Sequence, residues 1–171
     1  MSETRYEFDT ALGRCSLRYA GARVTAVLMP GAEGRPEPRG GGAGPPAEIL
    51  RAAEAIARLL DGEPSDLCFV ELDCSRVGPF ARDVYAAARE IPPGATTSYG
   101  ELARAAGHAG AAREVGAALA RNPFPIVVPC HRVLAADGTL HGFSAPGGLA
   151  TKRRMLEIEG APGFEQQPLF A

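Results

Sequence analysis

The sequence is poor in several residue types that mark particular classes of protein. Its 171 residues include no tryptophan, a single lysine (Lys152) and four cysteines, none of them spaced as a C-x-x-C pair. The three histidines form no metal-ligand pattern with the cysteines, so we expect neither disulfides nor a bound metal. No apolar run approaches the roughly 18 residues that a membrane span requires, and the segment 1–5 lacks a secretory apolar region. These absences predict a cytoplasmic protein with no membrane association.

The chain does contain enough apolar material for a folded core. Hydrophobic residues make up 46% of it, which excludes a disordered or collagen-like protein, and the length suits one domain or two small ones. The net charge of −2 argues against a general polyanion binder. The charge is uneven, since residues 1–75 contain 8 basic and 12 acidic side chains and residues 76–160 contain 10 and 7. Any nucleic-acid surface should therefore lie in the second half, although composition bias explains the preference for arginine better than phosphate contact does.

The first 75 residues predict a small antiparallel sheet followed by a helix. Short apolar runs alternate with turn signals over residues 1–29, and apolar positions recur at helical spacing over residues 47–60. Between them, 11 of the 17 residues from 30 to 46 are glycine or proline, which predicts a flexible loop. Residues 67–72 read as a further strand.

The second half predicts short helices. A domain boundary near residue 76 precedes a helix over 80–90, which the sequence Pro92-Pro93-Gly94 ends. Ser98 and Glu101 have the spacing of a capping box, which opens a short helix. A glycine turn then leads into a second helix over 111–121, so the pair resembles a helix-turn-helix.

The helix over 111–121 has a surface of small residues. Such a surface lets the backbone approach DNA closely, but it equally suits tight packing inside the protein. Arg113, which projects from it, favours DNA. The small residues are Ala111, Ala112, Gly116 and Ala117.

Cys130 and His131 form a candidate nucleophile and base. The apolar run 125–129 predicts a buried strand that delivers them at its end. A thiolate is the reactive form of cysteine, and an imidazole can take the thiol proton. Neighbouring side chains on an extended backbone point to opposite faces, so a relay needs a turn at Cys130 or a water. A lone Cys-His pair is more often structural than catalytic.

The wider context of this pair resembles one known family. The run 126–133, Ile-Val-Val-Pro-Cys-His-Arg-Val, is similar to the active-site signature of the O6-alkylguanine-DNA alkyltransferases, and Asn122-Pro123 stands just upstream. Further matches follow in family order over about residues 80–160. They are Ile91-Pro92-Pro93-Gly94, Thr97 to Ala103, Ala112-Arg113, Val115-Gly116, Lys152 and Leu156 to Gly160.

The resemblance implies an α+β fold and a single-turnover reaction. Residues 1–75 would form a small ribonuclease-H-like domain, and residues 76–171 a mostly helical domain with a winged-helix-like helix-turn-helix. Cys130 would attack the alkyl carbon of O6-alkylguanine flipped out of double-stranded DNA and keep the alkyl group as a thioether. O4-alkylthymine is a second candidate lesion. The protein would be a monomer that uses no cofactor or metal.

The resemblance also implies roles for residues distant in sequence. Tyr99 would donate a proton toward guanine N3, and Asn122 would hydrogen-bond the turn before the active site. His131 would act on the Cys130 thiol through a water, and Glu159 would orient His131.

A second group of residues would contact the DNA or the flipped base. Arg113 would fill the place of the flipped guanine, while Val133 and Ser144 would line the guanine pocket. Ala111, Ala112, Gly116 and Arg132 complete the DNA-binding set.

The chain departs from the family pattern at several positions. Glu114 replaces a small residue in the second helix, where a carboxylate would repel phosphates, so DNA affinity is less secure than the chemistry. Phe143 stands where a tyrosine is usual, and the segment 144–148 is longer than the common turn. Tyr85 takes the place of a tryptophan, which we interpret as a change in core packing.

Two other functions compete with repair. An alkyltransferase-like protein binds lesions without an acceptor cysteine, and the presence of Cys130 argues against this class. A Cys-His hydrolase unrelated to DNA would turn over a small ester or peptide and would not need the small-residue helix.

Overall fold

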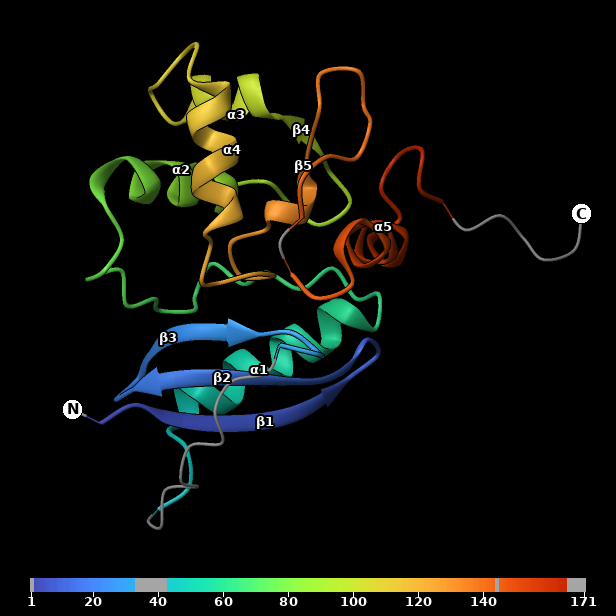
Figure 1. The fold of residues 1–171 in the computed structure, drawn as a ribbon. Coiled ribbons are helices and arrows are strands. Elements are labelled where there is room, and N and C mark those ends of the chain that lie inside the picture. Colours follow the sequence, from blue (N-terminus) through green and yellow to red (C-terminus); the bar gives the residue numbers. More distant parts are fainter. Residues whose placement is uncertain (1, 33–42, 144, 166–171) are drawn as a thin grey trace, which may run out of the picture.

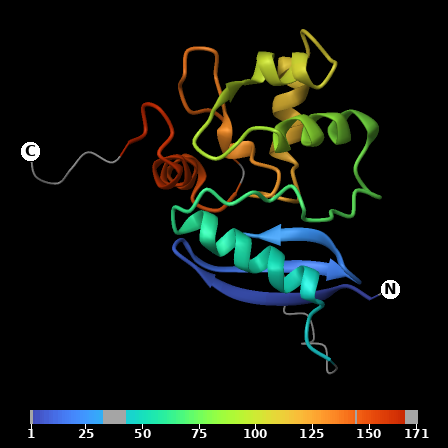
Figure 2. The ribbon, with the colours of Figure 1, turned by 180° about the vertical axis from the view of Figure 1, so that it is seen from behind.

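The computed structural model describes residues 2–32, 43–143 and 145–165 and has a mixed α/β fold. The first part is a three-stranded antiparallel sheet in the order β1 (Thr4–Thr10), β2 (Gly13–Ala20), β3 (Arg23–Leu28). Helix α1 (Ala47–Leu60) lies across one face of this sheet, as Figures 1 and 2 show from opposite sides. The expected sheet and helix are therefore confirmed. Most of the Gly/Pro-rich loop, residues 33–42, lies outside the described residues.

The spacing of apolar residues in α1 explains why it packs on the sheet. Ile49, Ala53, Ile56 and Leu60 are all buried, and they recur on one side of the helix. Burying a large aliphatic side chain contributes about 1.5–3 kcal/mol, so this stripe holds the layer together. The helix ends at the turn containing Gly62, whose φ of 96° suits glycine.

The expected strand over residues 67–72 is wrong. Arg89, the last residue of α2 (Pro79–Arg89), donates hydrogen bonds to the carbonyls of Leu67, Cys68 and Val70. Within the segment, the Val70 amide donates to the Leu67 carbonyl at 3.1 Å, so the backbone turns there instead of extending. The segment instead runs along the outer edge of β3, touching it through an isolated parallel bridge between Val24 and Leu72.

The second part of the chain is mostly helical and lies beyond the β3 edge of the sheet (Figure 1). Its helix α3 (Tyr99–Ala105) begins where the sequence predicts. Ser98 Oγ accepts from the Glu101 amide at 3.1 Å, and the Glu101 carboxylate accepts from the Ser98 amide at 3.3 Å. Strands β4 (Thr97–Ser98) and β5 (Val133–Leu134) pair in parallel. The elements are α2, β4 (Thr97–Ser98), α3 (Tyr99–Ala105), α4 (Ala112–Ala120), the 3-10 turn η1 (Cys130–Arg132), β5 (Val133–Leu134) and α5 (Gly148–Glu159).

Helices α3 and α4 form the expected helix-turn-helix, which packs on α2. Val115 and Leu119 of α4 are buried, and the Tyr85 hydroxyl of α2 donates to the Ala118 carbonyl at 2.8 Å. Tyr85 is therefore a buried core residue with a hydrogen-bonded hydroxyl, as the sequence predicts.

No helix in the described part of the chain is both long and apolar enough to cross a bilayer.

The expected strand over residues 125–129 is also wrong. An isolated bridge joins Pro125 to Val128, and buried Ile126 has a φ of 75°, which β-branched residues rarely adopt. Pro125 and Pro129 carry no amide donor, so the segment cannot sustain a ladder. It folds back on itself and leads into η1 at Cys130.

Candidate active site

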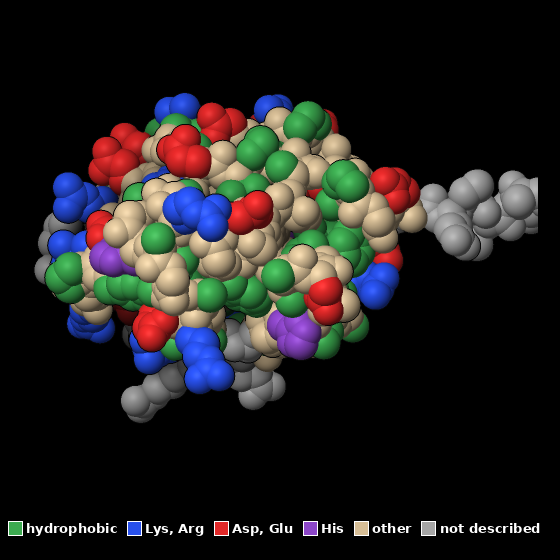
Figure 3. Space-filling view, turned by 90° about the horizontal axis from the view of Figure 1, so that it is seen from above, with side chains coloured by type: hydrophobic (Ala, Val, Ile, Leu, Met, Phe, Trp, Pro, Cys, Tyr) green, Lys and Arg blue, Asp and Glu red, His purple; other side chains and the backbone are tan. Residues whose placement is uncertain are grey.

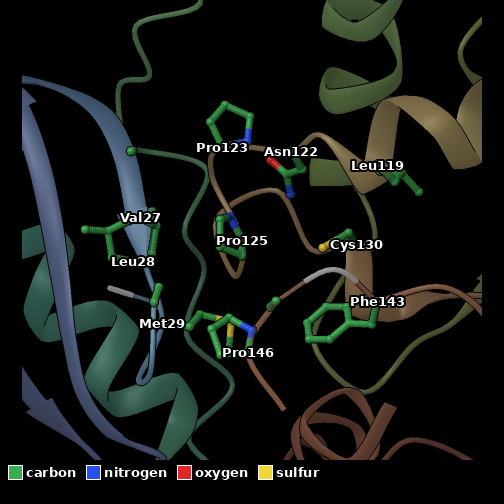
Figure 4. Close-up of a pocket in the computed structure, with 13 residues that line it drawn as sticks. Val27, Leu28, Met29, Leu119, Asn122, Pro123, Pro125, Cys130, Phe143 and Pro146 are labelled. Atoms are coloured by element: carbon green, nitrogen blue, oxygen red, sulfur yellow. The ribbon is translucent and has the colours of Figure 1, made fainter. Parts of the chain in front are cut away.

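Cys130 is the first residue of η1 and lies in the wall of a cavity of about 310 Å³. Its side chain is half-buried, and Figure 4 shows the sulfur on the side of Pro125 and Asn122. The backbone turns at this residue, so the extended arrangement that would separate Cys130 from His131 does not occur. A proton relay between these neighbours needs either a turn at Cys130 or a bridging water, and the structure has the turn.

Asn122 holds together the loop that carries Cys130. Its side-chain amide donates to the Val128 carbonyl at 3.0 Å, and its carbonyl oxygen accepts from the Phe124 amide at 2.8 Å. Burial raises the pKa of the Cys130 thiol, and a hydrogen bond from Asn122 to the sulfur opposes part of that rise. One side chain thus braces the loop between α4 and η1 and touches the sulfur.

His131 and Glu159 form a buried pair behind the cysteine. His131 Nε2 lies 2.7 Å from Glu159 Oε1, and the two side chains are 0% and 3% exposed. Because an ionised carboxylate only accepts, we assign the proton to Nε2. His131 Nδ1 is buried and has no hydrogen-bond partner among the described residues, so it is the nitrogen left to act as a base.

Arg132 completes this network from the interior. Its Nε and Nη2 atoms donate to the two oxygens of Glu159 at 3.0 and 2.8 Å, and Nη1 donates to the Ile91 carbonyl at 2.6 Å. Its assignment to the DNA-binding set is therefore wrong, because the side chain is buried and its donors are used inside the protein. The sequence alone gives no sign of this burial.

The electrostatics of the network follow from burial and from Arg132. Burial raises the pKa of Glu159, but the hydrogen bonds and charges of His131 and Arg132 outweigh it and bring the pKa down to about 2. Burial lowers the pKa of His131, so the imidazole is neutral at pH 7. Burial also raises the pKa of the Cys130 thiol, so the thiol needs a base to become a nucleophile.

Tyr99 and Lys152 both bond one carbonyl oxygen, and both interact electrostatically with the cysteine. The Tyr99 hydroxyl donates to the His141 carbonyl at 3.1 Å, and Lys152 Nζ donates to the same oxygen at 2.9 Å and to the Val133 carbonyl at 2.6 Å. Lys152 is fully buried, and burial lowers its pKa to about 8. Burial raises the pKa of Tyr99, which keeps its hydroxyl protonated as a donor.

Helix α4 presents the exposed part of the site. Arg113 and Glu114 are exposed, and neither forms an ion pair with any residue of the described part of the chain. A Cβ added at Gly116 would lie 3.9 Å from the Tyr99 ring, which is an ordinary van der Waals distance, so this part of α4 faces the tyrosine and has room for a methyl group. Figure 3 shows the face formed by α3, α4 and the loop after β5, where acidic and basic side chains are interspersed.

The structure thus groups the predicted residues into two sets. Cys130, Asn122, His131 and Glu159 come together in one connected arrangement, and Tyr99 lies close enough for the cysteine to raise its pKa. The exposed α4 residues form the second set, and Ser144 lies outside the described residues. Ala111 and Ala112 are half-buried at the start of α4, and Val133 is buried in β5.

One central residue was underestimated from the sequence. The sequence marks Lys152 as the single lysine and as part of a matching segment, and the structure shows that it ties β5 to the loop containing His141. Its signal was its rarity, because it is the only lysine of the chain. Across residues 2–32, 43–143 and 145–165, no three His, Cys, Asp or Glu side chains gather as metal ligands.

Comparison with known proteins matches this arrangement to one family. Residues 79–161 fit the model of the family described as 6-O-methylguanine DNA methyltransferase, DNA binding domain. A methylated-DNA–protein-cysteine methyltransferase of Mycobacterium tuberculosis is 41% identical over 125 residues, 73% of each chain. One of Methanothermobacter thermautotrophicus is 40% identical over 116 residues, which are 68% of this chain and 64% of that protein, slightly less than two thirds of its length.

Solved structures extend the similarity to the whole fold. The crystal structure of the M. tuberculosis O6-methylguanine methyltransferase superposes with a TM-score of 0.74 at 36% identity, covering 95% of this chain and 96% of that one. The structure of the M. tuberculosis protein OGT in complex with DNA gives a TM-score of 0.74 at 34% identity, covering 94% and 96%. The chain therefore belongs to the methylated-DNA–protein-cysteine methyltransferase family.

Proposed function

We propose that this protein repairs DNA by moving the alkyl group of O6-alkylguanine onto Cys130, once per molecule. The observation that carries the proposal is the position of the Cys130 thiol, which opens onto a cavity and is backed by the buried His131–Glu159 pair. A nucleophile, a base and a group that orients the base are the parts that activate a thiol. Membership of the family supports alkylated DNA as the substrate.

In the proposed reaction, atoms and charges balance within the site. A bond forms between Cys130 Sγ and the alkyl carbon while the bond from that carbon to guanine O6 breaks, and its electron pair leaves on the guanine. The thiol proton passes through a water to His131 Nδ1, and the ionised Glu159 stabilises the imidazolium. Tyr99 gives its hydroxyl proton to guanine N3, so the guanine leaves neutral and Tyr99 is left as a phenolate. The negative charge of this phenolate balances the positive charge of protonated His131.

The DNA partner would lie against α4. A similar structure, the M. tuberculosis protein OGT, was solved in complex with DNA, which supports DNA as the partner here. Half-buried Ala112 and Gly116 let the helix backbone approach a groove closely. Exposed Arg113 is free to enter the duplex where the flipped guanine leaves a gap.

The remaining expectations belong to the same proposal. Alkylated guanine is the main lesion, and O4-alkylthymine is a second one with the same alkyl-oxygen bond to break. We expect a monomer, because all residues of the proposed site come from one chain. We also expect the protein to act in the cytoplasm.

A Cys130→Ser variant separates repair from the two rival functions. We expect it to lose transfer completely from a duplex containing O6-methylguanine while it still binds that duplex in a fluorescence-anisotropy titration. Cys68→Ser is the matched control, since the Cys68 thiol is also free but exposed, and it should transfer normally. Methyl transfer that persists without Cys130 would refute the assigned nucleophile, and turnover of simple esters by the unaltered protein would favour a hydrolase.

A further inference from the structure

A second cavity lies between the sheet and the helical half of the chain, on the side of the molecule where β2 ends and α2 begins (Figure 1). Its volume is about 710 Å³, within the roughly 300–1,000 Å³ of ligand pockets. Neither Cys130 nor the His131–Glu159 pair lines it, so it lies outside the candidate active site. We call it the arginine cavity, because Arg18, Arg76 and Arg121 line it.

The charges of this lining are only partly balanced. Three arginines and two carboxylates supply them, namely Arg18, Arg76, Arg121, Glu3 and Asp73. Glu3 accepts a hydrogen bond from the Thr25 hydroxyl. Hydrogen bonds from Ser75 lower the pKa of Asp73, and the charges of Arg23 and Arg76 add to this effect. Neither Arg18 nor Arg121 forms an ion pair within residues 2–32, 43–143 and 145–165.

Arg18 is a half-buried cation that the sheet itself does not explain. Its Nε atom is buried and has no hydrogen-bond partner in the described part of the chain, which is rare in folded proteins. It lies directly opposite Arg5 of β1, and like charges in such a pair destabilise a sheet. Arg5 has a partner, Glu7, at 3.3 Å. Between Arg18 and Tyr19 the pairing with β3 shifts its register, an irregularity of the kind that re-aims a side chain.

Arg121 brings a second cation to the same cavity from the other half of the chain. It is exposed at the end of α4, and its charge opposes the burial that raises the pKa of Tyr85 to about 12. Tyr85 lines the cavity too, so this charge acts at the cavity wall. The amino end of α2 also faces the cavity, and its first turn contains no acidic residue to offset the partial positive charge of the helix.

We propose that the arginine cavity binds a phosphate group, held by Arg18 from the amino-terminal sheet and by Arg121 from the end of α4. A guanidinium presents a planar fork of donors that matches two oxygens of a phosphate. A phosphate group also supplies the negative charge that these two arginines lack among the described residues. The inference goes beyond the proposed function, because no step of the alkyl transfer uses this cavity.

The phosphate group has two possible sources, the backbone of DNA and a small phosphorylated molecule. The nine residues of α4 span about 13 Å, the rise of about four base pairs. DNA at the Ala112 end of this helix therefore brings its backbone to Arg121 only if the duplex runs along α4. A small phosphorylated molecule needs no such alignment.

The first test titrates inorganic pyrophosphate into the whole protein by isothermal titration calorimetry, and we expect one site per molecule. Arg18→Gln and Arg121→Gln each remove one cation, so each should weaken binding by about 10-fold or more. Arg14→Gln is the matched control, because it removes the same charge from the same strand. Arg14 pairs with Asp9 at 3.1 Å and does not line the cavity, so its affinity should stay within about twofold.

A second titration, with an undamaged duplex, identifies the source of the phosphate group. If DNA supplies it, pyrophosphate competes with the duplex, and Arg18→Gln lowers the slope of log affinity against log salt by about 0.9. If a small molecule supplies it, Arg18→Gln binds the duplex like the unaltered protein, and pyrophosphate binds alongside DNA.

The inference is overturned if both arginine variants match Arg14→Gln in pyrophosphate binding and in the salt slope. A weakening specific to Arg18→Gln or Arg121→Gln in either titration supports it. The two arginines lie in different halves of the chain, so if one variant fails to fold the other still decides the outcome. Neither titration uses a lesion, so a failure of methyl transfer would overturn the proposed function and leave this test intact.

Discussion

The two sides of the site are built in contrasting ways. Behind Cys130, Glu159 and His131 are almost fully buried and bonded at fixed distances, together with Arg132. In front, Arg113 and Glu114 are exposed on α4. Removing one partner of a buried ion pair costs much free energy of folding, because the other charge stays buried without a counter-charge. An exposed charge is screened by water, so its pairing contributes little. The comparison indicates that the chemistry depends on a few interior bonds and the DNA affinity on many small surface contributions.

Substituting Glu159 should have the largest effect on stability and on transfer. Glu159→Gln leaves the buried Arg132 guanidinium without its counter-charge, so we expect the free energy of unfolding to fall by about 3–5 kcal/mol. Transfer should slow as well, because His131 loses the group that stabilises its protonated form. Glu157→Gln is the matched control on α5, since Glu157 pairs at 3.8 Å with exposed Arg154, and its effect should stay below about 1 kcal/mol. Similar losses in denaturant titrations of both variants would contradict the contrast.

Acid should weaken the interior network in a defined pH range. His131 has its pKa held below the ordinary 6.5, so stability first falls below that pH, where only the unfolded imidazole takes a proton. Glu159, with its pKa lowered from 4.5 to about 2, contributes fully above pH 4.5 and loses its contribution as the pH falls toward 2. The Glu159 part amounts to about 3 kcal/mol. Unfolding followed as a function of pH checks this, and an unchanged acid dependence in Glu159→Gln would refute it.

The same change, tyrosine to phenylalanine, should affect transfer at Tyr99 and stability at Tyr85. Tyr99→Phe should slow transfer by about 100-fold or more, the effect of losing a proton donor, while lesion binding persists. Tyr85→Phe removes a hydroxyl that donates to the buried Ala118 carbonyl, so it should cost about 1 kcal/mol of stability and leave the transfer step unchanged. Rapid-quench measurements at saturating protein separate transfer from binding. Equal rates for both variants would remove Tyr99 from the mechanism.

The smallest effect is expected on the exposed surface. Glu114→Gln removes a negative charge from the helix that faces DNA, so we expect binding to tighten by at most about fivefold. The gain should shrink as salt is added, because exposed charges are screened. Anisotropy titrations at two salt concentrations measure it. Weaker binding in Glu114→Gln would show that the carboxylate contributes to DNA contact rather than opposing it.

The sequence predicts those features that depend on neighbours along the chain. The capping box of Ser98 and Glu101 is local, and so is the amphipathic stripe of α1, and both occur as expected. The two segments wrongly predicted as strands, residues 67–72 and 125–129, owe their conformation to distant groups or to proline. In the first segment, the backbone carbonyls accept hydrogen bonds from Arg89, which is distant in sequence. In the second, Pro125 and Pro129 have no amide hydrogen to donate to a neighbouring strand.

The site could be predicted in part for the same reason. The residues around Cys130 and His131 predict a nucleophile and a base, and the family resemblance adds Glu159. The structure places His131 and Glu159 within hydrogen-bond distance. It did not reveal that Arg132 is buried, because an arginine in a sequence is most often exposed. The burial of Lys152 also follows from tertiary packing alone.

The most direct test of the account is the mass of the intact protein after mixing with duplex DNA that contains O6-methylguanine, followed by peptide mapping. The account predicts the gain of one methyl group per molecule, located on Cys130. Modification of another residue, or tight binding of the lesion with no gain in mass, would contradict it.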